Sequence, residues 1–368
     1  MGKTISDYFF SFADRNLPAK QVSDYVAYTQ NDFYFNLALL KKNRINRLKV
    51  HFSRTNLQKI FISANLSGVD FKIDGWDINY LEKGFFQVLD CNDFEKKLLY
   101  LKDSLVIVNN NDVGHHAVTR HYADIFSMSD STIFAVWDFD NHHWLELSTF
   151  LAAHSDLYIP THHENLYLLT RYNWLTAGPV YAGSIQWSKK YITDHLPEMI
   201  TAHRSDVPLG MHIPYSVFRF RIQTITTLNQ HYPTVGFSNR TFHDRKIEDR
   251  LKEWYSFKSH WIVPVLNDVS IRIFDALITG GIPIVSESLR FLPPINEISR
   301  DHILFYGPYD IIDPQNLVTT ANELFDHGGA DKVVERHRYA LNHHHGYNRI
   351  HQIIMYANEV FALDIRSR

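Results

Sequence analysis

The chain has 368 residues, 45% of them hydrophobic and 21% charged, which predicts two folded domains and excludes a disordered or fibrous protein. The formal net charge is −3 and the 37 Lys and Arg residues are spread along the chain, so no nucleic-acid partner is expected. A single cysteine, Cys91, excludes an internal disulfide framework and favours a reducing compartment.

Short apolar runs alternate with longer amphipathic stretches in the first half, which is typical of a parallel α/β sheet. A helix that covers the sheet is predicted over residues 142–154, because the spacings of Leu145, Leu147, Phe150 and Leu151 suit a helix. The strands predicted here cover residues 47–53, 59–65, 103–111, 131–138 and 155–162.

The second half repeats the alternation and ends in a helix over 349–363. Its predicted elements are a helix over 216–232, a strand over 233–239, a helix over 246–258, a strand over 260–268, a helix over 270–281, strands over 282–288 and 302–307, and a helix over 314–326. Gly and Pro residues between 176 and 216 indicate a boundary. We expect domains 1–185 and 186–348, a terminal segment 349–368, and two doubly wound domains facing each other across a cleft.

In open parallel sheets, ligands bind beyond the carboxyl ends of the strands, so the polar residues that follow each strand are candidates for a site. In the first half these are Asp138, Asp140, His142, His143, His162 and His163. In the second half they are Ser238, Arg240, Asn267, Ser270, Arg272 and Glu287.

The segment 266–294 predicts a phosphate site. It contains a strand, a polar loop, a helix that starts near Ser270 and Arg272, and a second strand. A helix N-terminus offers free N–H groups and the positive end of the helix dipole, and an arginine adds donors that suit phosphate oxygens. Gly280 and Gly281 end the helix where a left-handed residue is needed.

The same segment resembles the donor-binding domain of GT-B glycosyltransferases. Its pattern S-x-R-x-F-D-A-L-x-x-G-G-I-P-I-V (270–285) is similar to the Ser-x-Arg, Glu-Ala-Leu and Gly-Cys-Ile-Pro-Val elements of exostosin-like members. The resemblance implies that Asp275 holds the donor ribose and that Asn267 replaces the first acid of a Glu-x7-Glu pair. It also implies a GT-B fold whose C-terminal helix packs on the N-terminal domain.

The stretch VWDFDNHHW (136–144) has three interpretations. Asp138 and Asp140 look like the Asp-x-Asp that holds a cation in GT-A enzymes, although GT-B enzymes generally need no metal. A second possibility is that Asp138, Asp140, His142 or His143 takes the proton of an acceptor hydroxyl. A third is a polar turn in which Asp140 or Asn141 caps the next helix. His162 and His163 are predicted to contact the acceptor, or to form a solvated helix start.

The resemblance implies a glycosyltransferase that moves a sugar from a nucleotide-sugar donor to a saccharide or lipid-linked saccharide. We expect no cofactor besides this co-substrate, no metal, and a cytoplasmic protein with possible peripheral membrane association, engaged in surface-polysaccharide or glycoconjugate assembly. No run approaches the ~20 apolar residues of a membrane span, and the N-terminus lacks the apolar core of a signal peptide. The alternatives are a nucleotide-sugar epimerase and a two-domain sugar-binding protein without enzymatic activity.

Overall fold

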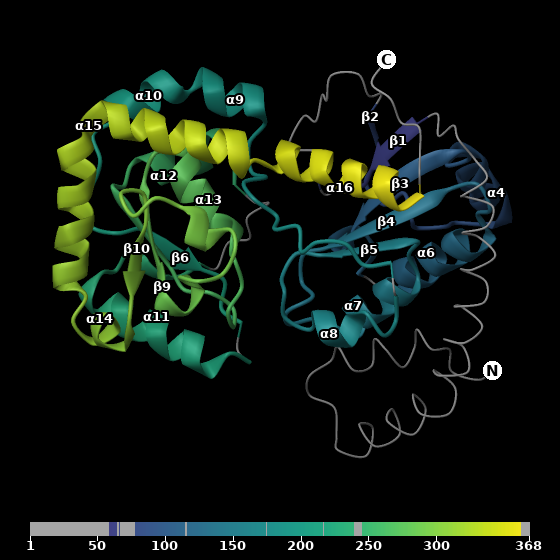
Figure 1. Cartoon of the computed structure of the whole chain (residues 1–368), viewed down its shortest axis with the longest axis horizontal. Helices are drawn as coiled ribbons and strands as arrows, with labels where there is room; N and C mark the ends of the chain where they lie inside the picture. The colour runs from purple at the N-terminus through teal and green to yellow at the C-terminus, as the bar shows by residue number, and fades with distance from the viewer. Residues whose placement is uncertain are drawn as a thin grey trace. The chain divides into compact units, whose positions relative to one another are not determined.

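The computed structural model describes residues 59–64, 66, 78–114, 116–173, 175–215, 217–238 and 245–361. The predicted strand at 47–53 and the candidate Arg240 lie outside these ranges. The chain is a mixed α/β protein with parallel sheets, which confirms that part of the prediction (Figure 1). It divides into two compact units, a first unit of Met1–Tyr181 with Ile350–Arg368, and a second unit of Ala182–Arg349. Among the described residues, no helix is long and apolar enough to cross a membrane.

A five-stranded sheet organises the first unit. Neighbouring strands pair in parallel in the order β2-β1-β3-β4-β5. Every residue of β3 and β4 is buried, as expected for strands covered on both faces. The strands are β1 (Lys59–Ile62), β2 (Ile78–Tyr80), β3 (Ser104–Asn109), β4 (Ile133–Asp138) and β5 (Leu157–Pro160).

The helices of the first unit include the end of the chain. They are α4 (Cys91–Tyr100), α5 (Asn110–Val113), α6 (His116–Met128), α7 (Leu145–Ala153), α8 (Leu166–Leu169) and α16 (Gly346–Phe361), of which residues 350–361 belong to this unit. Ile350, Ile353, Ile354, Ala357 and Phe361 are buried at helical spacing along α16, drawn in yellow in Figure 1. Because this apolar stripe is buried, the part of α16 from residue 350 to residue 361 packs as part of the first unit.

Five parallel strands also organise the second unit. The strands β10-β9-β8 and β6-β7 form two parallel groups, and Leu209 joins them because its carbonyl accepts a hydrogen bond from Trp261 N at 2.8 Å. The resulting order is β7-β6-β8-β9-β10, so in both units the first strand lies between the second and the third. The strands are β6 (Gly210–His212), β7 (Val235–Phe237), β8 (Ser259–Ile262), β9 (Ile282–Ser286) and β10 (Leu304–Tyr306).

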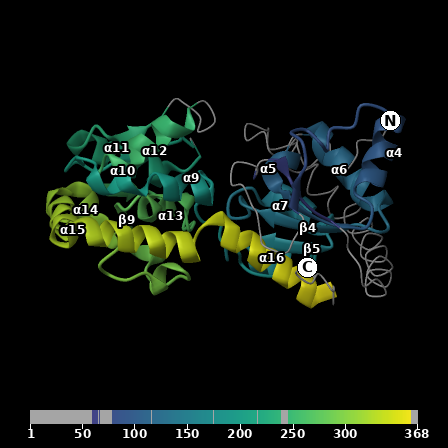
Figure 2. The same cartoon turned by 90° about the horizontal axis from the view of Figure 1, so that it is seen from above.

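Helices connect successive strands of this unit, in the manner of a doubly wound fold. Figure 2 labels these helices from a second side. The connecting helices are α11 (Arg219–His231), α12 (Ile247–Tyr255) and α13 (Ile271–Ile278); the others are α9 (Lys189–Asp194), α10 (Leu196–Thr201), α14 (Pro308–Ile312) and α15 (Gln315–His343), with short 3₁₀ turns at Glu287–Leu289 and Ile295–Glu297. Helix α13 packs against β8, β9 and α15. In a sheet of this strand order, ligands bind where the strand order reverses, here between the carboxyl ends of β6 and β8.

Several element boundaries differ from the prediction. The strand predicted over 260–268 ends at Ile262, because Leu266 adopts a positive φ of 58° and the Asp268 side chain accepts a hydrogen bond from Val265 N at 2.5 Å. The helix predicted over 314–326 continues to His343 past a non-helical Gly329. Strands β2 and β6 were not predicted.

Candidate functional site

Two arginine side chains meet at the carboxyl ends of β6 and β8. Arg272 Nη1 donates a hydrogen bond to Met211 O, next to the end of β6. Arg221 donates from Nε to Val263 O at 3.2 Å and from Nη1 to Ile213 O at 2.7 Å. These hydrogen bonds end on neutral backbone carbonyls and fix the two guanidinium groups in place.

The two arginines share this corner with carboxylates, since the charges of Asp275 and Asp268 raise the pKa of Arg272 against the effect of burial. Burial lowers the pKa of Arg272, and burial together with the charge of Arg272 lowers the pKa of Arg221, yet guanidinium groups stay protonated in proteins. Burial and these two arginines hold the pKa of His212 well below its usual range, so His212 is neutral. Its Nε2 accepts a hydrogen bond from Val263 N at 3.1 Å.

The start of α13 lies beside this corner. Ser270 is its N-cap residue, and Ser270 Oγ accepts a hydrogen bond from Arg272 N at 3.4 Å. The first turn of the helix therefore places its N–H groups next to the Arg272 side chain, which combines the two features predicted to bind phosphate. Ser238 is also nearby, because its N–H donates to His212 O at 2.8 Å.

Two further predicted donor residues lie between the ends of β8 and β9. Asn267 Oδ1 accepts a hydrogen bond from Ser288 Oγ at 2.9 Å, and both side chains are exposed. Glu287 Oε1 forms an ion pair with Arg290 Nη1 at 3.0 Å, so the charge of this carboxylate is balanced by a neighbouring side chain. The structure thus brings Ser238, Asn267, Ser270, Arg272 and Glu287 to one edge of one sheet.

Asp275 lies one turn deeper in α13 and is fully buried. Its carboxylate accepts hydrogen bonds from Ser184 Oγ at 2.8 Å and from Gln186 Nε2. Burial raises the pKa of Asp275 to about 7. The contact of Asp275 with a ribose stays a prediction. Ser184 and Gln186 could not be identified from the sequence as its partners, because they lie about 90 residues away along the chain.

We expect the variant Asp275→Asn to change the pH dependence of stability. The folded-state pKa lies above the unfolded value near 3.8, so the aspartate reduces stability progressively as pH rises from about 4 to 7. Asparagine cannot ionise, so stability relative to wild type should rise by about 1 kcal/mol per pH unit in this window and level off above it. Urea unfolding at several pH values measures this, with the exposed Asp331→Asn as control; a difference independent of pH would contradict it.

In the first unit, Asp138 is directed into the protein. Its side chain is fully buried at the end of β4, where Oδ2 accepts a hydrogen bond from Tyr158 OH at 2.6 Å and Oδ1 accepts one from Asp140 N at 3.1 Å. Burial raises the pKa of Asp138 to about 6. The carboxylate therefore ties β4 to β5 and shapes the following turn.

Three predicted histidines gather beyond β4 and β5. His143 Nδ1 lies 2.8 Å from His142 Nε2, and the rings of His142 and His162 meet edge to face with centroids 4.2 Å apart. Asp140 Oδ1 lies 3.7 Å from His143 Nε2. His163 does not join this group, since its side chain is 39% exposed and its Nδ1 lies 3.7 Å from Glu164 Oε2.

The turn after β4 is polar, but the prediction that Asp140 or Asn141 caps the next helix is wrong. The N-cap residue of α7 is Trp144, which makes no side-chain hydrogen bond to the helix. Asn141 bonds instead to the chain after β5, where Oδ1 accepts from His162 N at 2.9 Å and Nδ2 donates to Glu164 O at 2.8 Å. Asn141 thus fixes the position of His162.

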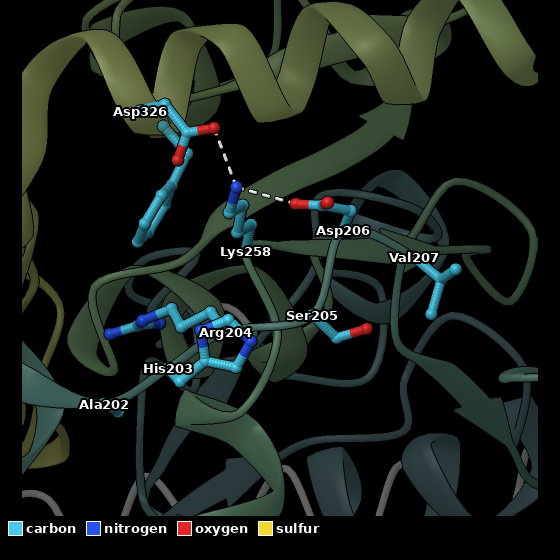
Figure 3. A pocket seen from close by; sticks show the side chains of 9 residues that line it. Ala202, His203, Arg204, Ser205, Asp206, Val207, Lys258 and Asp326 are labelled. Carbon is cyan, nitrogen blue, oxygen red and sulfur yellow. Dashed lines mark hydrogen bonds and ion pairs between the residues drawn. The ribbon is translucent and has the colours of Figure 1, made fainter.

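A pocket of about 590 Å³ opens near the amino end of β8 (Figure 3). Lys258 lines this pocket and pairs with Asp206 Oδ1 at 2.6 Å and Asp326 Oδ2 at 2.7 Å. Arg204 also lines it, but its guanidinium donates to backbone carbonyls, including Thr279 O at 2.8 Å. The pocket holds none of the predicted site residues and lies at the edge of the sheet opposite to Arg221 and Arg272.

Comparisons with known proteins give little guidance. No protein-family model matches the chain, and no curated protein matches it. Among solved structures, the chain is similar to HepE from Anabaena, whose crystal structure is a complex with UDP-glucose. The identity is 10%, the TM-score is 0.47, and the match covers 82% of this chain and 99% of HepE.

Proposed function

We propose that the chain is a glycosyltransferase that uses a nucleotide-sugar donor. The observation that carries this proposal is the pair of arginines, Arg221 and Arg272, held beside the N-terminus of α13 at the point where the strand order of the second unit reverses. Doubly wound folds bind nucleotides at this point, with phosphates at a helix N-terminus. A neutral sugar alone would not need two arginines.

The chemistry of glycosyl transfer explains the need for positive charge. When the bond between the sugar and the diphosphate breaks, negative charge grows on the leaving phosphate oxygen. Fixed cations and N–H dipoles stabilise this charge most when they are already in place before the reaction. Arg221, Arg272 and the first turn of α13 provide such groups, and Ser238, Arg240, Asn267, Ser270, Asp275 and Glu287 complete the proposed donor site.

In the same proposal the acceptor binds to the first unit. The imidazole groups of His142, His143 and His162 gather beyond the carboxyl ends of β4 and β5, where a hydroxyl group needs a proton acceptor. The acceptor would be a saccharide or a lipid-linked saccharide. The proposal includes a GT-B fold and no cofactor. It also includes a role in glycoconjugate assembly, in the cytoplasm or at its membrane.

A thermal-shift screen of UDP-, GDP-, dTDP- and CMP-sugars tests the donor site. A ligand at 100 times its Kd stabilises the folded state by about 2.7 kcal/mol, so one nucleotide class should raise the Tm by several degrees. Free sugars without the nucleotide should not. Absence of a shift with every donor contradicts the proposal. Transfer to an added oligosaccharide then distinguishes a transferase from an epimerase, which needs no acceptor.

A further inference from the structure

Three consecutive backbone carbonyls at the end of α13 accept hydrogen bonds from buried side chains of the second unit. The pairs are Ile278 O with His337 Nδ1 at 2.6 Å, Thr279 O with Arg204 Nη2 at 2.8 Å, and Gly280 O with Arg336 Nε at 2.9 Å. The donors lie between 56 and 75 residues away along the chain. The last carbonyls of a helix have no partner within the helix, so these side chains cap its C-terminus.

The two arginines in this cap are buried among neutral groups. Arg336 is fully buried and Arg204 is 5% exposed. Arg204 also donates to Met199 O at 2.9 Å and to Phe257 O at 3.3 Å, and both guanidinium groups lie over the ring of Phe325, with Cζ 5.0 and 5.2 Å from its centroid. Within the described residues, Nη1 and Nη2 of Arg336 have no hydrogen-bond partner. A buried cation is costly unless negative groups surround it, and here these groups are carbonyl oxygens and a ring face.

Both arginines keep their charge. Burial and the charge of Arg336 lower the pKa of Arg204 to about 9, and burial lowers the pKa of Arg336 to about 10 while the charge of Glu335 opposes this effect. The two side chains are therefore protonated at pH 7. His337 is different, because burial lowers its pKa below the usual value, so it contributes a hydrogen bond to the cap but no charge.

Carboxylates in the neighbourhood of the cap pair with lysines. Glu335 Oε2 lies 2.8 Å from Lys332 Nζ, and the carboxylates of Asp206 and Asp326 in the pocket described above pair with Lys258 at 2.6 and 2.7 Å. All three carboxylates are more than half exposed, where water and salt weaken their effect on a buried charge. Two buried positive charges thus lie at the C-terminus of α13.

The position of these charges matters because α13 is short. Its eight residues span about 12 Å. A helix has about half a positive charge at its N-terminus and about half a negative charge at its C-terminus. Cations at the C-terminus cancel the negative end, so the positive end near Ser270 and Arg272 is less opposed. Over this distance, charges in the protein interior interact more strongly than charges in water.

We propose that Arg204 and Arg336 are positioning residues of the donor site, which orient α13 and, by cancelling the negative end of its dipole, strengthen the attraction of its N-terminus for the donor diphosphate. The proposal rests on the glycosyltransferase function above. Neither arginine contacts the donor, because both lie at the other end of the helix. Their effect reaches the donor through α13.

The variants Arg336→Gln and Arg336→Lys test the charge. Glutamine keeps an N–H donor for Gly280 O but has no charge, so the Kd of the nucleoside diphosphate of the class found in the thermal-shift screen should rise about fivefold to tenfold. Lysine keeps the charge, so its Kd should stay within about twofold of wild type. Isothermal titration calorimetry below the unfolding temperature of each variant measures both values.

The matched control removes the same charge from the surface of the same helix. Arg338 lies two residues after Arg336 in α15 and is exposed. Water and salt screen a charge at such a position, so Arg338→Gln should leave the Kd of the nucleoside diphosphate unchanged.

Ligands of different charge give a readout that a merely structural role would not move. In Arg336→Gln the loss of affinity should be largest for the nucleoside diphosphate, smaller for the monophosphate and absent for the uncharged nucleoside. A distorted helix would weaken all three alike. Arg204→Gln should give the same order, which keeps the proposal testable if Arg336→Gln fails to fold.

The outcomes separate this proposal from the proposed function. A wild-type protein that binds no nucleotide or nucleotide sugar contradicts the glycosyltransferase function and removes the basis of the positioning role. A wild-type protein that binds the nucleoside diphosphate, while Arg336→Gln and Arg204→Gln keep its Kd, overturns the positioning role alone. Equal losses in Arg336→Gln and Arg336→Lys, or equal losses for the nucleoside and the diphosphate, would limit the arginines to folding of the helix end and also overturn it.

Discussion

Replacing Arg272 with alanine is expected to weaken binding of the nucleotide sugar by roughly 100-fold. Losing one partner of a buried, hydrogen-bonded charge pair typically costs 2–5 kcal/mol, and about 3 kcal/mol corresponds to this change in Kd. The variant removes the guanidinium that Met211 O holds beside the start of α13. Isothermal titration calorimetry with the donor found in the thermal-shift screen measures the effect.

Three further variants show whether this loss is specific. Arg272→Lys keeps the charge but loses the planar fork of donors, so its affinity should lie between wild type and Arg272→Ala. Arg221→Ala should also weaken binding, since its guanidinium faces the same corner. Arg338→Ala, at an exposed position of α15, should have no effect. Unchanged donor affinity in Arg272→Ala would remove the phosphate-binding role of this residue.

The segment around α13 was predictable because its signals are local. Ser270 caps the helix two residues before Arg272, the apolar residues fall on one face, and Gly280 adopts the left-handed φ of 77° that the helix end requires. Each of these features depends on residues within one or two turns. The parallel α/β class was predictable for the same reason, since buried parallel strands such as β3 and β4 are continuous apolar runs.

Arg221 could not be identified from sequence as a part of the donor site. In α11 it lies in a polar, arginine-rich stretch that has the composition of a solvated helix. Its position depends on hydrogen bonds to Val263 O, 42 residues away, and to Ile213 O, just after the three-residue strand β6. Only the fold brings these segments together, so no local sequence pattern could indicate that Arg221 belongs to the donor site.

The site at residues 138–143 could be predicted from the sequence only in part. Adjacent imidazoles and carboxylates after a strand predicted a polar site at 138–143, but four side chains remained equivalent candidates. The structure separates them through distant partners. Tyr158 binds Asp138 within the sheet, whereas Asn110 binds Asp140 from 30 residues away and directs it toward His143. The direction of a side chain depends on such long-range contacts, which spacing alone does not contain.

Replacing Gly183 with alanine is expected to destabilise the protein by about 3 kcal/mol or more. Gly183 has a φ of 69°, a left-handed conformation that costs other residues about 1–2 kcal/mol. An added Cβ would also lie 2.2 Å from His344 O. The backbone cannot move away freely, because Ser184 N donates to His344 O at 2.7 Å and Gly346 N donates to Ser184 O at 2.8 Å. Overpacking of this kind adds roughly 1–3 kcal/mol.

The control for this variant is Gly84→Ala, which separates the two contributions. Gly84 also has a positive φ, 80°, but the nearest atom to an added Cβ is Gln87 Oε1 at 4.0 Å. Its alanine variant should lose only the conformational part, about 1–2 kcal/mol. Urea unfolding of both variants measures the difference, which reports the tightness of the contact between residues 183–184 and 344–346. Equal losses would mean that these two segments separate easily and that the backbone absorbs the added methyl group.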